Sequence, residues 1–355
     1  MFNVLLDLPK TFSVGIDGNF LSSENSPFQL KGIKLVEPGV HFIHLEDLNL
    51  NLRSGIWING KDDHTLVIDI KDGISDLSVF IVNHMTREMI VKPSTDPVDV
   101  DYSIEVGKIL DTMSENFPLM VNYSSLNTKH PHWESLTKYI SFPRILDVLQ
   151  GNHWFTLPIS TLDASKQENE YLIDKLSKTS MEKNPDRIIQ SLRKDDYQMI
   201  FSTIEFNKTA RPNATPSQLT QDSVDKSWFV ETKLLPGLLL EFQLSFLLFM
   251  ILNNASAASH WVNIIKIMLN CDSLVEINEN LFIEFFDCLS IQLKIIPEEL
   301  VASSDSMVNL QALKESLTTF NETIENPKVR RSFNRVKDTL KLQFQFEDID
   351  FLDDI

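Results

Sequence analysis

In the first 150 residues, short apolar segments with alternating polar positions predict strands separated by turns. Three of these segments, residues 11–16, 55–58 and 64–70, are each followed by one of the dipeptides Asp17-Gly18, Asn59-Gly60 and Asp72-Gly73. Such pairs favour hairpins, because both central residues of the turn need positive φ. Two helices, at residues 103–116 and 133–149, are predicted to close this part of the chain.

The pattern changes twice after residue 156. Residues 157–196 are rich in Ser, Lys, Glu and Asp, with few apolar positions, which is typical of an exposed linker with one weak helix at most. Residues 197–206 predict one more strand. From Thr215 onward the apolar period becomes helical, with Thr215 as the N-cap and Pro216 in the first turn. A bundle or a stack of helical hairpins is therefore expected.

The end of the chain alternates again. Apolar residues at 340, 342, 344 and 346 alternate with polar ones and are followed by five acidic residues, which predicts a strand and then an acidic segment. The predicted fold class is α+β. We expect a β-rich, sandwich-like N-terminal domain (1–156), a polar linker (157–196), an all-α C-terminal domain (197–325) and an extended C-terminal tail (326–355) with a strand-like segment.

Composition restricts the class of protein. With 355 residues, 43% of them hydrophobic, the chain can bury a sizeable core. Its net charge of −18 disfavours direct binding to nucleic acid and to anionic membranes. Two cysteines, Cys271 and Cys288, suit a reducing compartment and buried thiols. No signal peptide is recognisable, and the apolar stretch 234–252 is expected to be a buried helix rather than a membrane span.

Candidate chemistry is sparse. His41 and His44 stand three apart on a predicted strand, so their side chains face opposite sides and cannot share a metal ion. His130 and His132 fit a turn better than a metal site, and Ser135 with Lys138 matches a Ser-x-x-Lys pattern that lacks its companion motifs. Phosphate-binding glycine loops and zinc-helix motifs are absent from the sequence. We therefore expect no enzyme activity, no metal and no cofactor.

Several segments match the pattern of one protein family in consistent order. The first is Gly15-Ile16-Asp17, followed by residues 32–44, although Leu30-Lys31 and Glu37 depart from the family pattern. In the helical half the match continues through Thr215-Pro216 and Trp228, the latter in place of a usual tyrosine. It then includes the positions Glu241, Gln243, Phe246, His260 and Trp261. On these residues the sequence resembles the AAR2 splicing-factor family.

This resemblance implies a two-domain assembly chaperone of the U5 small nuclear ribonucleoprotein in pre-mRNA splicing. The implied partner is the RNase-H-like region, and a neighbouring domain, of the large U5 scaffold protein Prp8. Such a chaperone delays binding of RNA and of a late-joining RNA helicase. We also expect a monomer before binding, located in the cytoplasm, with the nucleus as a second location, since the cysteine usage suits a reducing compartment. A hydrolase with dispersed catalytic residues and a generic protein-interaction adaptor stay open as alternatives.

Two hypotheses concern the end of the chain. The predicted strand could add to an exposed sheet edge of the partner, with Leu340, Leu342, Phe344, Phe346 and Phe351 as partner-binding residues. Alternatively, it packs on its own domain. Ser332 follows Arg330 and Arg331 and is a candidate phosphorylation site, because added negative charge near an acidic tail would alter its docking.

Overall fold

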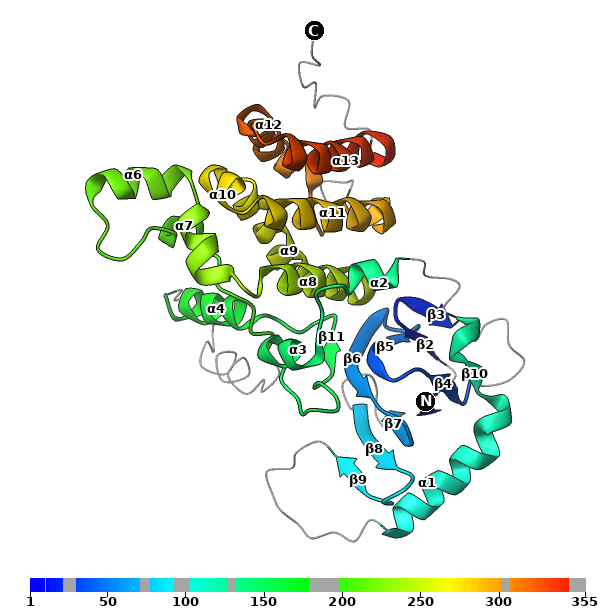
Figure 1. The fold of residues 1–355 in the computed structure, drawn as a ribbon. Helices are drawn as coiled ribbons and strands as arrows, with labels where there is room; N and C mark the ends of the chain where they lie inside the picture. The colour runs from blue at the N-terminus through cyan, green and yellow to red at the C-terminus, as the bar shows by residue number, and fades with distance from the viewer. Residues whose placement is uncertain are drawn as a thin grey trace. The chain divides into compact units, whose positions relative to one another are not determined.

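The computed structural model describes residues 1–9, 11–21, 30–70, 77–91, 103–126, 132–178, 198–301 and 307–344 (Figure 1). The chain forms two compact units. Unit 1 comprises Met1–Trp133, Ser141–Ile200 and Ile251–Asn254, and unit 2 comprises Glu134–Ile140, Phe201–Met250 and Ala255–Ile355. Each unit is therefore assembled from segments that are distant in sequence.

Unit 1 contains two β-sheets. The first has the order β10-β4-β1-β7-β8-β9 and the second the order β11-β6-β5-β2-β3. Most neighbours are antiparallel, but β1 runs parallel to β7 and β10 parallel to β4. The strand bounds are Phe2–Asp7 (β1), Phe12–Ile16 (β2), Asn19–Leu21 (β3), Gly32–Val36 (β4), Gly39–Asp47 (β5), Leu52–Gly60 (β6), His64–Ile70 (β7), Leu77–Asn83 (β8), Met89–Val91 (β9), Val121–Asn122 (β10) and Ile159–Ser160 (β11).

The core of unit 1 contains side chains from both sheets. Phe2, Val4 and Leu66 come from the first sheet, and Val14 and Ile56 from the second, and all five belong to one buried apolar cluster. Two sheets that share one core form a sandwich, so the predicted sandwich-like N-terminal domain is confirmed. The central strands are buried on both faces, since β2 is buried at every position and β7 at all but one.

One predicted hairpin is confirmed and another is wrong. Asp17 and Gly18 have positive φ angles of 53° and 76° and connect the antiparallel pair β2 and β3. Asn59 and Gly60, in contrast, remain within β6 and pair with β5, and the next strand, β7, belongs to the other sheet. Gly60 is needed here for close packing, because a Cβ atom at this position would collide with the ring of Phe2.

The helical predictions near the linker are partly correct. The helix α1 (Ser103–Asn116) has the predicted bounds, but residues 133–149 form two short helices, α2 (Trp133–Leu136) and α3 (Phe142–Val148). Ser141 is the non-helical N-cap of α3 and Pro143 lies in its first turn, where a missing N–H costs nothing. The polar linker contains α4 (Lys166–Lys178).

The strand predicted at 197–206 is wrong. Of these residues, Met199 makes an isolated bridge to Ser165, and Phe206 begins the single 3-10 turn η4 (Phe206–Lys208). Two further 3-10 turns, η1 (Phe117–Leu119) and η2 (Tyr123–Ser125), flank β10 in unit 1. A short apolar pattern of this kind does not separate a strand from an irregular buried segment.

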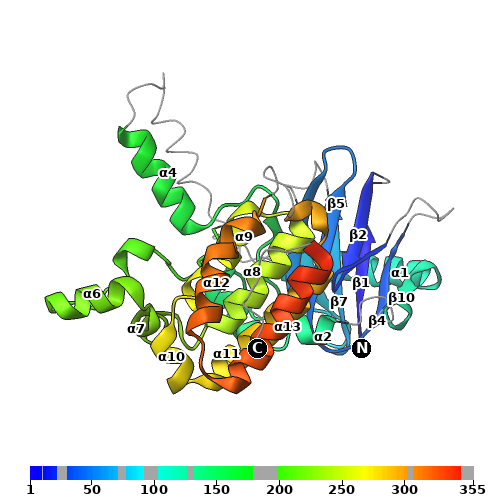
Figure 2. The ribbon, with the colours of Figure 1, turned by 90° about the horizontal axis from the view of Figure 1, so that it is seen from above.

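Unit 2 is helical. Its most apolar helix, α8, is buried over nearly all of its length, and α13 packs along α11 (Figures 1 and 2). The helix bounds are Pro216–Val224 (α6), Ser227–Phe229 (α7), Leu238–Leu252 (α8), Ala255–Met268 (α9), Asp272–Ile277 (α10), Glu279–Ile295 (α11), Lys314–Thr323 (α12) and Pro327–Phe344 (α13), with short turns at Val230–Leu234 (η5, a π turn), Glu298–Leu300 (η6) and Leu310–Leu313 (η7).

The strand predicted at 340–346 is wrong for its described part. Residues 340–344 are the last turn of α13, and the extended tail predicted from residue 326 is helical up to Phe344. Residues 345–355, including Phe346 and Phe351, lie outside the described residues. The buried positions of α13 recur with a helical period, at Val329, Phe333, Val336 and Leu340.

Among the described residues, no single helix has the length and hydropathy of a membrane span. The segments Ser227–Leu234 and Leu238–Leu252 pass that test only when they are joined, and they are bent by 84° at their junction. The buried helix predicted for this region corresponds to α8.

Candidate functional site

In unit 1, His41 and His44 both lie on β5 and are buried. Asp17, at the β2–β3 turn, accepts hydrogen bonds from the Tyr123 hydroxyl (2.5 Å) and the Phe42 amide (2.9 Å), and its carboxylate lies 2.7 Å from Nδ1 of His41. Burial, reinforced by Asp17, raises the pKa of Tyr123, so this phenol stays protonated as a donor. The cluster joins three chain segments and leaves no group directed at solvent.

His41 and His44 occupy different surroundings, as expected for positions three apart on a strand. The His44 ring lies 4.4 Å from the Phe20 ring and 5.9 Å from the Phe42 ring, measured between centroids. No group of three or more His, Cys, Asp or Glu within the described residues could hold a metal ion. His130 lies outside that range, and Trp133, two residues after Pro131, begins α2.

A second buried cluster, in unit 2, brings together a serine, a glutamate and a histidine. Glu241 on α8 accepts hydrogen bonds from the hydroxyl (2.6 Å) and the amide (2.9 Å) of Ser202, and its Oε2 lies 2.8 Å from Nε2 of His260 on α9. Burial raises the pKa of Glu241, but its hydrogen bonds with His260 and Ser202 outweigh burial, so the net pKa is lowered. Glu241 is therefore held as a carboxylate.

This cluster contains the residue types of a catalytic triad in the wrong order. In a triad the imidazole lies between the hydroxyl and the carboxylate, so that it can take the proton of the nucleophile. Here the carboxylate lies between them and binds both partners. The arrangement connects α8, α9 and the segment at Ser202, and it does not activate the serine.

The remaining sequence candidates for chemistry are also held in structural contacts. Lys138 lies 3.5 Å from Glu284 and over the ring of Tyr139. Cys271 and Cys288 are buried, as predicted, and burial raises the pKa of the Cys288 thiol to about 11. A thiol with so high a pKa has almost no thiolate near neutral pH, so it is a poor nucleophile.

The helix α6 is different, because nearly all of it is exposed. Of its nine residues, only Asp222 is buried. Thr215 and Gln218 form a capping box at its start, which confirms the predicted N-cap. Leu219 and Val224 are apolar and exposed. A short exposed helix has little stability of its own, so tertiary contacts must hold it in place.

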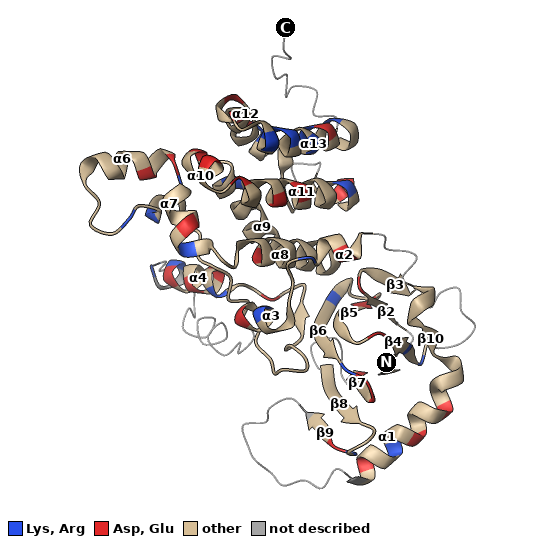
Figure 3. Ribbon diagram, viewed as in Figure 1, with Lys and Arg blue, Asp and Glu red and all other residues tan. Residues whose placement is uncertain are grey.

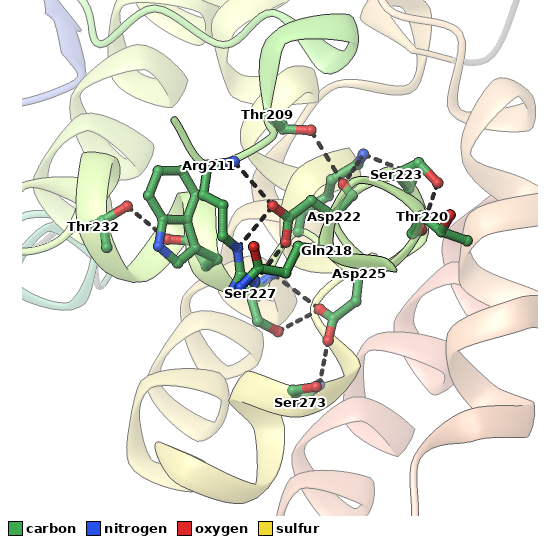
Figure 4. Close-up of polar contacts among 12 residues, drawn as sticks. Thr209, Arg211, Gln218, Thr220, Asp222, Ser223, Asp225, Ser227, Thr232 and Ser273 are labelled. Carbon is green, nitrogen blue, oxygen red and sulfur yellow. Dashed lines mark hydrogen bonds and ion pairs between the residues drawn. The ribbon is translucent and has the colours of Figure 1, made fainter. Parts of the chain in front are cut away.

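Those contacts form the polar cluster in Figure 4. Arg211 binds both carboxylate oxygens of Asp222, at 3.0 and 2.7 Å, and donates its backbone amide to the same side chain. The hydrogen bond with Arg211 lowers the pKa of Asp222. Lys226 donates to the carbonyl oxygens of Asp222 and Ser223, each at 2.8 Å, at the end of α6. These bonds fix the direction of the helix.

The same cluster continues to α10. Asp225 accepts hydrogen bonds from the amides of Ser227 (2.9 Å) and Ser273 (3.2 Å), so one carboxylate joins the end of α6 to the starts of α7 and α10 (Figure 4). Every charged group drawn here is engaged by another group of the cluster. The arrangement suits a rigid support for an exposed helix and not an active site.

The structure separates the residues proposed to bind a partner. In a helix, positions 340 and 344 share one side and position 342 faces the other. Accordingly, Leu340 is 2% exposed, Leu342 is 82% exposed and Phe344 is partly buried. Leu340 therefore belongs to the core of unit 2 and is not available to a partner, whereas Leu342 is.

Ser332 lies on the buried side of α13. The relative solvent exposure of Ser332 is 2%, and its hydroxyl accepts a hydrogen bond from Arg335 at 2.8 Å. The helix as packed does not present this hydroxyl to a kinase. Its phosphorylation stays a prediction and requires α13 to detach from α11 first.

Two features were not recognised from the sequence. One is the Arg211–Asp222 cluster, for which the spacing of Asp222 and Lys226 at i and i+4 was an available signal. The other is the charge of α13, which contains six Lys or Arg and one Asp and appears blue in Figure 3. The extended tail and strand predicted for this segment hid the charge of α13. A helix places on one side residues that a strand would place on two.

Comparisons with known proteins agree on one family. Residues 1–151 match the model of the AAR2 N-terminal domain, and residues 201–348 match that of the AAR2 C-terminal repeat region. The chain is similar to the A1 cistron-splicing factor AAR2 of Saccharomyces cerevisiae, with 24% identity over 85% of this chain and 78% of the relative. It is also similar to the human protein AAR2 homolog, with 22% identity over 83% and 76%.

Proposed function

Because the chain belongs to the AAR2 splicing-factor family, we propose that it is a non-catalytic assembly chaperone of the U5 small nuclear ribonucleoprotein. Its role is related to pre-mRNA splicing. The proposed partner is the RNase-H-like region of the large U5 scaffold protein Prp8, with a neighbouring domain, and the bound state delays RNA and the late-joining helicase.

Family membership carries this proposal, since the two family models cover both halves of the chain in order. The buried polar clusters support the non-catalytic part. Glu241 binds Ser202 and His260 without activating either, and Asp17 holds a protonated tyrosine. A protein whose charged groups are engaged in this way is suited to binding other proteins through its surface.

Charge supports the choice of partner. A domain that handles RNA neutralises phosphates with Lys and Arg, so its RNA-binding surface is basic. A chain with a net charge of −18 is attracted to such a surface and can compete with RNA for it. The proposed competition therefore depends on ionic strength, as any contact between opposite charges in water does.

The first test is affinity purification of the tagged full-length chain from its own cells, followed by mass spectrometry. We expect Prp8 and other U5 proteins to be recovered. We also expect the protein itself to lie in the cytoplasm and, as a second location, in the nucleus. Recovery of a set without splicing proteins would instead favour a generic adaptor.

The second test is a competition assay with the recombinant RNase-H-like domain and a fluorescent single-stranded RNA. The chain is expected to displace the RNA at low salt and to do so less well as salt is raised. An unrelated protein of similar size and net charge is the control for non-specific displacement. If both proteins displace RNA equally, the specific part of the proposal is wrong.

A further inference from the structure

The helix α13 has a charge opposite to that of the protein. Its 18 residues carry six Lys or Arg and one Asp, a net of +5, while the whole chain carries −18. Lys328 and Arg335 reach α11, whereas Arg331 and Lys341 are exposed on the side of α13 opposite its buried positions. Figure 3 marks the basic residues of α13 in blue. A local charge of this size attracts acidic groups over roughly 8 Å at physiological ionic strength.

Only part of this charge is neutralised by neighbours within the described residues. Lys328 pairs with Glu279 at 2.6 Å and Arg335 with Asp287 at 2.5 Å, both on α11. Arg331 and Lys341 are exposed, and no ion pair of theirs is formed with the described residues. Together with Asn334, Asp338 and Leu342, these two residues define what we call the α13 face, on which the two basic residues outnumber the one acidic residue.

The chain that follows α13 has the complementary composition. Residues 345–355 contain five Asp or Glu, no Lys or Arg, and five apolar residues. The α13 face has the matching pair of features, because the exposed Leu342 lies beside Lys341. Charge and apolar contact are therefore complementary between the face and the segment that follows it.

We propose that the α13 face binds the acidic segment 345–355 of the same chain. The segment runs back along the helix, so that its acidic residues meet Arg331 and Lys341 and its later carboxylates lie near Lys328. This contact is independent of the proposed role in splicing, since it uses residues of this chain alone.

The segment is long enough for this path. From Phe344 back to Lys328 is about 24 Å at 1.5 Å per helical residue. Ten extended residues span up to about 33 Å, which leaves room for a reversing turn. Direct attachment also gives the segment a high effective concentration at the face, on the order of millimolar for a short flexible connection.

An acidic segment of the same chain fits the α13 face better than RNA does. Phosphates would be attracted to α13 but repelled by the rest of a chain with a net charge of −18. For the acidic segment the penalty is smaller, because it is attached to that chain and is repelled by it in the undocked state as well. Exposed ion pairs are individually weak, so the contact depends on several of them and is sensitive to salt.

The test is zero-length carbodiimide cross-linking of the full-length chain at low salt, followed by peptide mass spectrometry. This reagent joins a carboxylate to a lysine amine with loss of water and without a spacer. The diagnostic product links Asp353 or Asp354 to Lys328, because Lys341 is too near in sequence to be informative. Mixing isotopically heavy and light protein separates links within one chain from links between two.

We expect the Lys328 link within one chain, and its loss at high salt. Reversing the face with Arg331→Glu and Lys341→Glu should lower its yield about five-fold, the effect of losing two exposed ion pairs. The matched control is Arg144→Glu with Lys233→Glu, which changes the net charge equally at exposed positions elsewhere. Control and wild type should give the same yield.

A variant with Asp350, Asp353 and Asp354 all changed to Asn leaves α13 untouched. Hydrogen exchange of residues 345–355 is compared between this variant and wild type, and faster exchange in the variant is expected. Three results overturn the proposal: absence of the Lys328 link within one chain, equal loss in the control, or unchanged exchange in the Asn variant. Binding of a fluorescent RNA to α13 with none of these effects would assign the face to nucleic acid.

Discussion

Oε2 of Glu241 on α8 lies 2.8 Å from Nε2 of His260 on α9, and both side chains are buried. The two residues stand nineteen positions apart and belong to the segments that resemble the AAR2 family. Glu241 also accepts two hydrogen bonds from Ser202, so one carboxylate on α8 joins two other parts of unit 2. The family pattern at Glu241 and His260 therefore reflects how α8 and α9 pack together.

Replacing Glu241 by Ala should strongly destabilise the protein. The change leaves His260 and Ser202 without their buried acceptor, and we expect a loss of about 3–5 kcal/mol in the free energy of unfolding. Urea denaturation followed by circular dichroism measures it. Glu231→Ala, at an exposed position in η5, is the control and should change stability by about 0.5 kcal/mol at most. Equal effects would show that the buried cluster is not stabilising.

The same carboxylate should make stability depend on pH. Because the folded pKa of Glu241 is below its ordinary value of 4.5, its ionised form stabilises the fold above that value. This contribution is lost as the pH falls through the folded pKa. The stability difference between wild type and Glu241→Gln should therefore be full at pH 7 and smaller below pH 4.5. A difference that stays constant across that range would contradict the lowered pKa.

The polar cluster should be required for the order of α6. Asp222→Asn removes the charged acceptor of Arg211, and hydrogen bonds to charged groups are worth about 1.5–3 kcal/mol. We expect faster cleavage of residues 205–225 in limited proteolysis, with a smaller effect on global stability, because only α6 and its connections depend on the cluster. Gln221→Ala, on the exposed side of α6, should cleave like wild type. Unchanged cleavage in Asp222→Asn would mean that α6 is held in another way.

Leu340 and Leu342 distinguish a helix from a strand at the end of α13. Leu340→Ala should cost about 2–5 kcal/mol of stability, because it leaves a cavity against α11. Leu342→Ala should change stability by about 0.5 kcal/mol at most, because its side chain is exposed. In a strand the two residues would share one face and respond alike. Thermal denaturation of both variants decides between these structures.

Ser332→Glu should destabilise α13, because it places a charge on the side that packs against α11. Asn334→Glu makes the nearly identical change on the exposed side of the same helix and should be tolerated. We expect the melting temperature to fall clearly in the first variant and to change little in the second. Equal melting temperatures would show that Ser332 can be modified while α13 stays packed.

The sequence predicted the two classes of structure and several local details correctly. Thr215 with Pro216 marked the start of α6, because an N-cap side chain and a proline act on the nearest turn only. Asp17 with Gly18 marked the β2–β3 hairpin for the same reason. These features are determined by neighbours within four residues.

The Asn326-Pro327 step carries the same signal, although the sequence pattern predicted an extended tail from residue 326. Asn326 accepts hydrogen bonds from the amides of Lys328 and Val329, and Pro327 begins α13, so the pair starts a helix in the way that Thr215-Pro216 does. The alternation after Thr339 concealed this. Read from Pro327, the buried positions have a helical period that the last few residues alone do not show.

The sequence by itself determined the helix N-cap at Thr215, the turn with positive φ at Asp17-Gly18 and the change from strand to helix between the two halves. It also contains no phosphate-binding glycine loop and no zinc-helix motif. The tertiary structure decided which strands share a sheet, since β6 and β7 belong to different sheets although β6 ends in the turn-like dipeptide Asn59-Gly60. It also decided that the chain is helical up to Phe344, because the apolar side of α13 is buried against α11 and, at Phe333, against Phe320 of α12. Local signals act over a few bonds, whereas burial depends on residues that sequence places far apart.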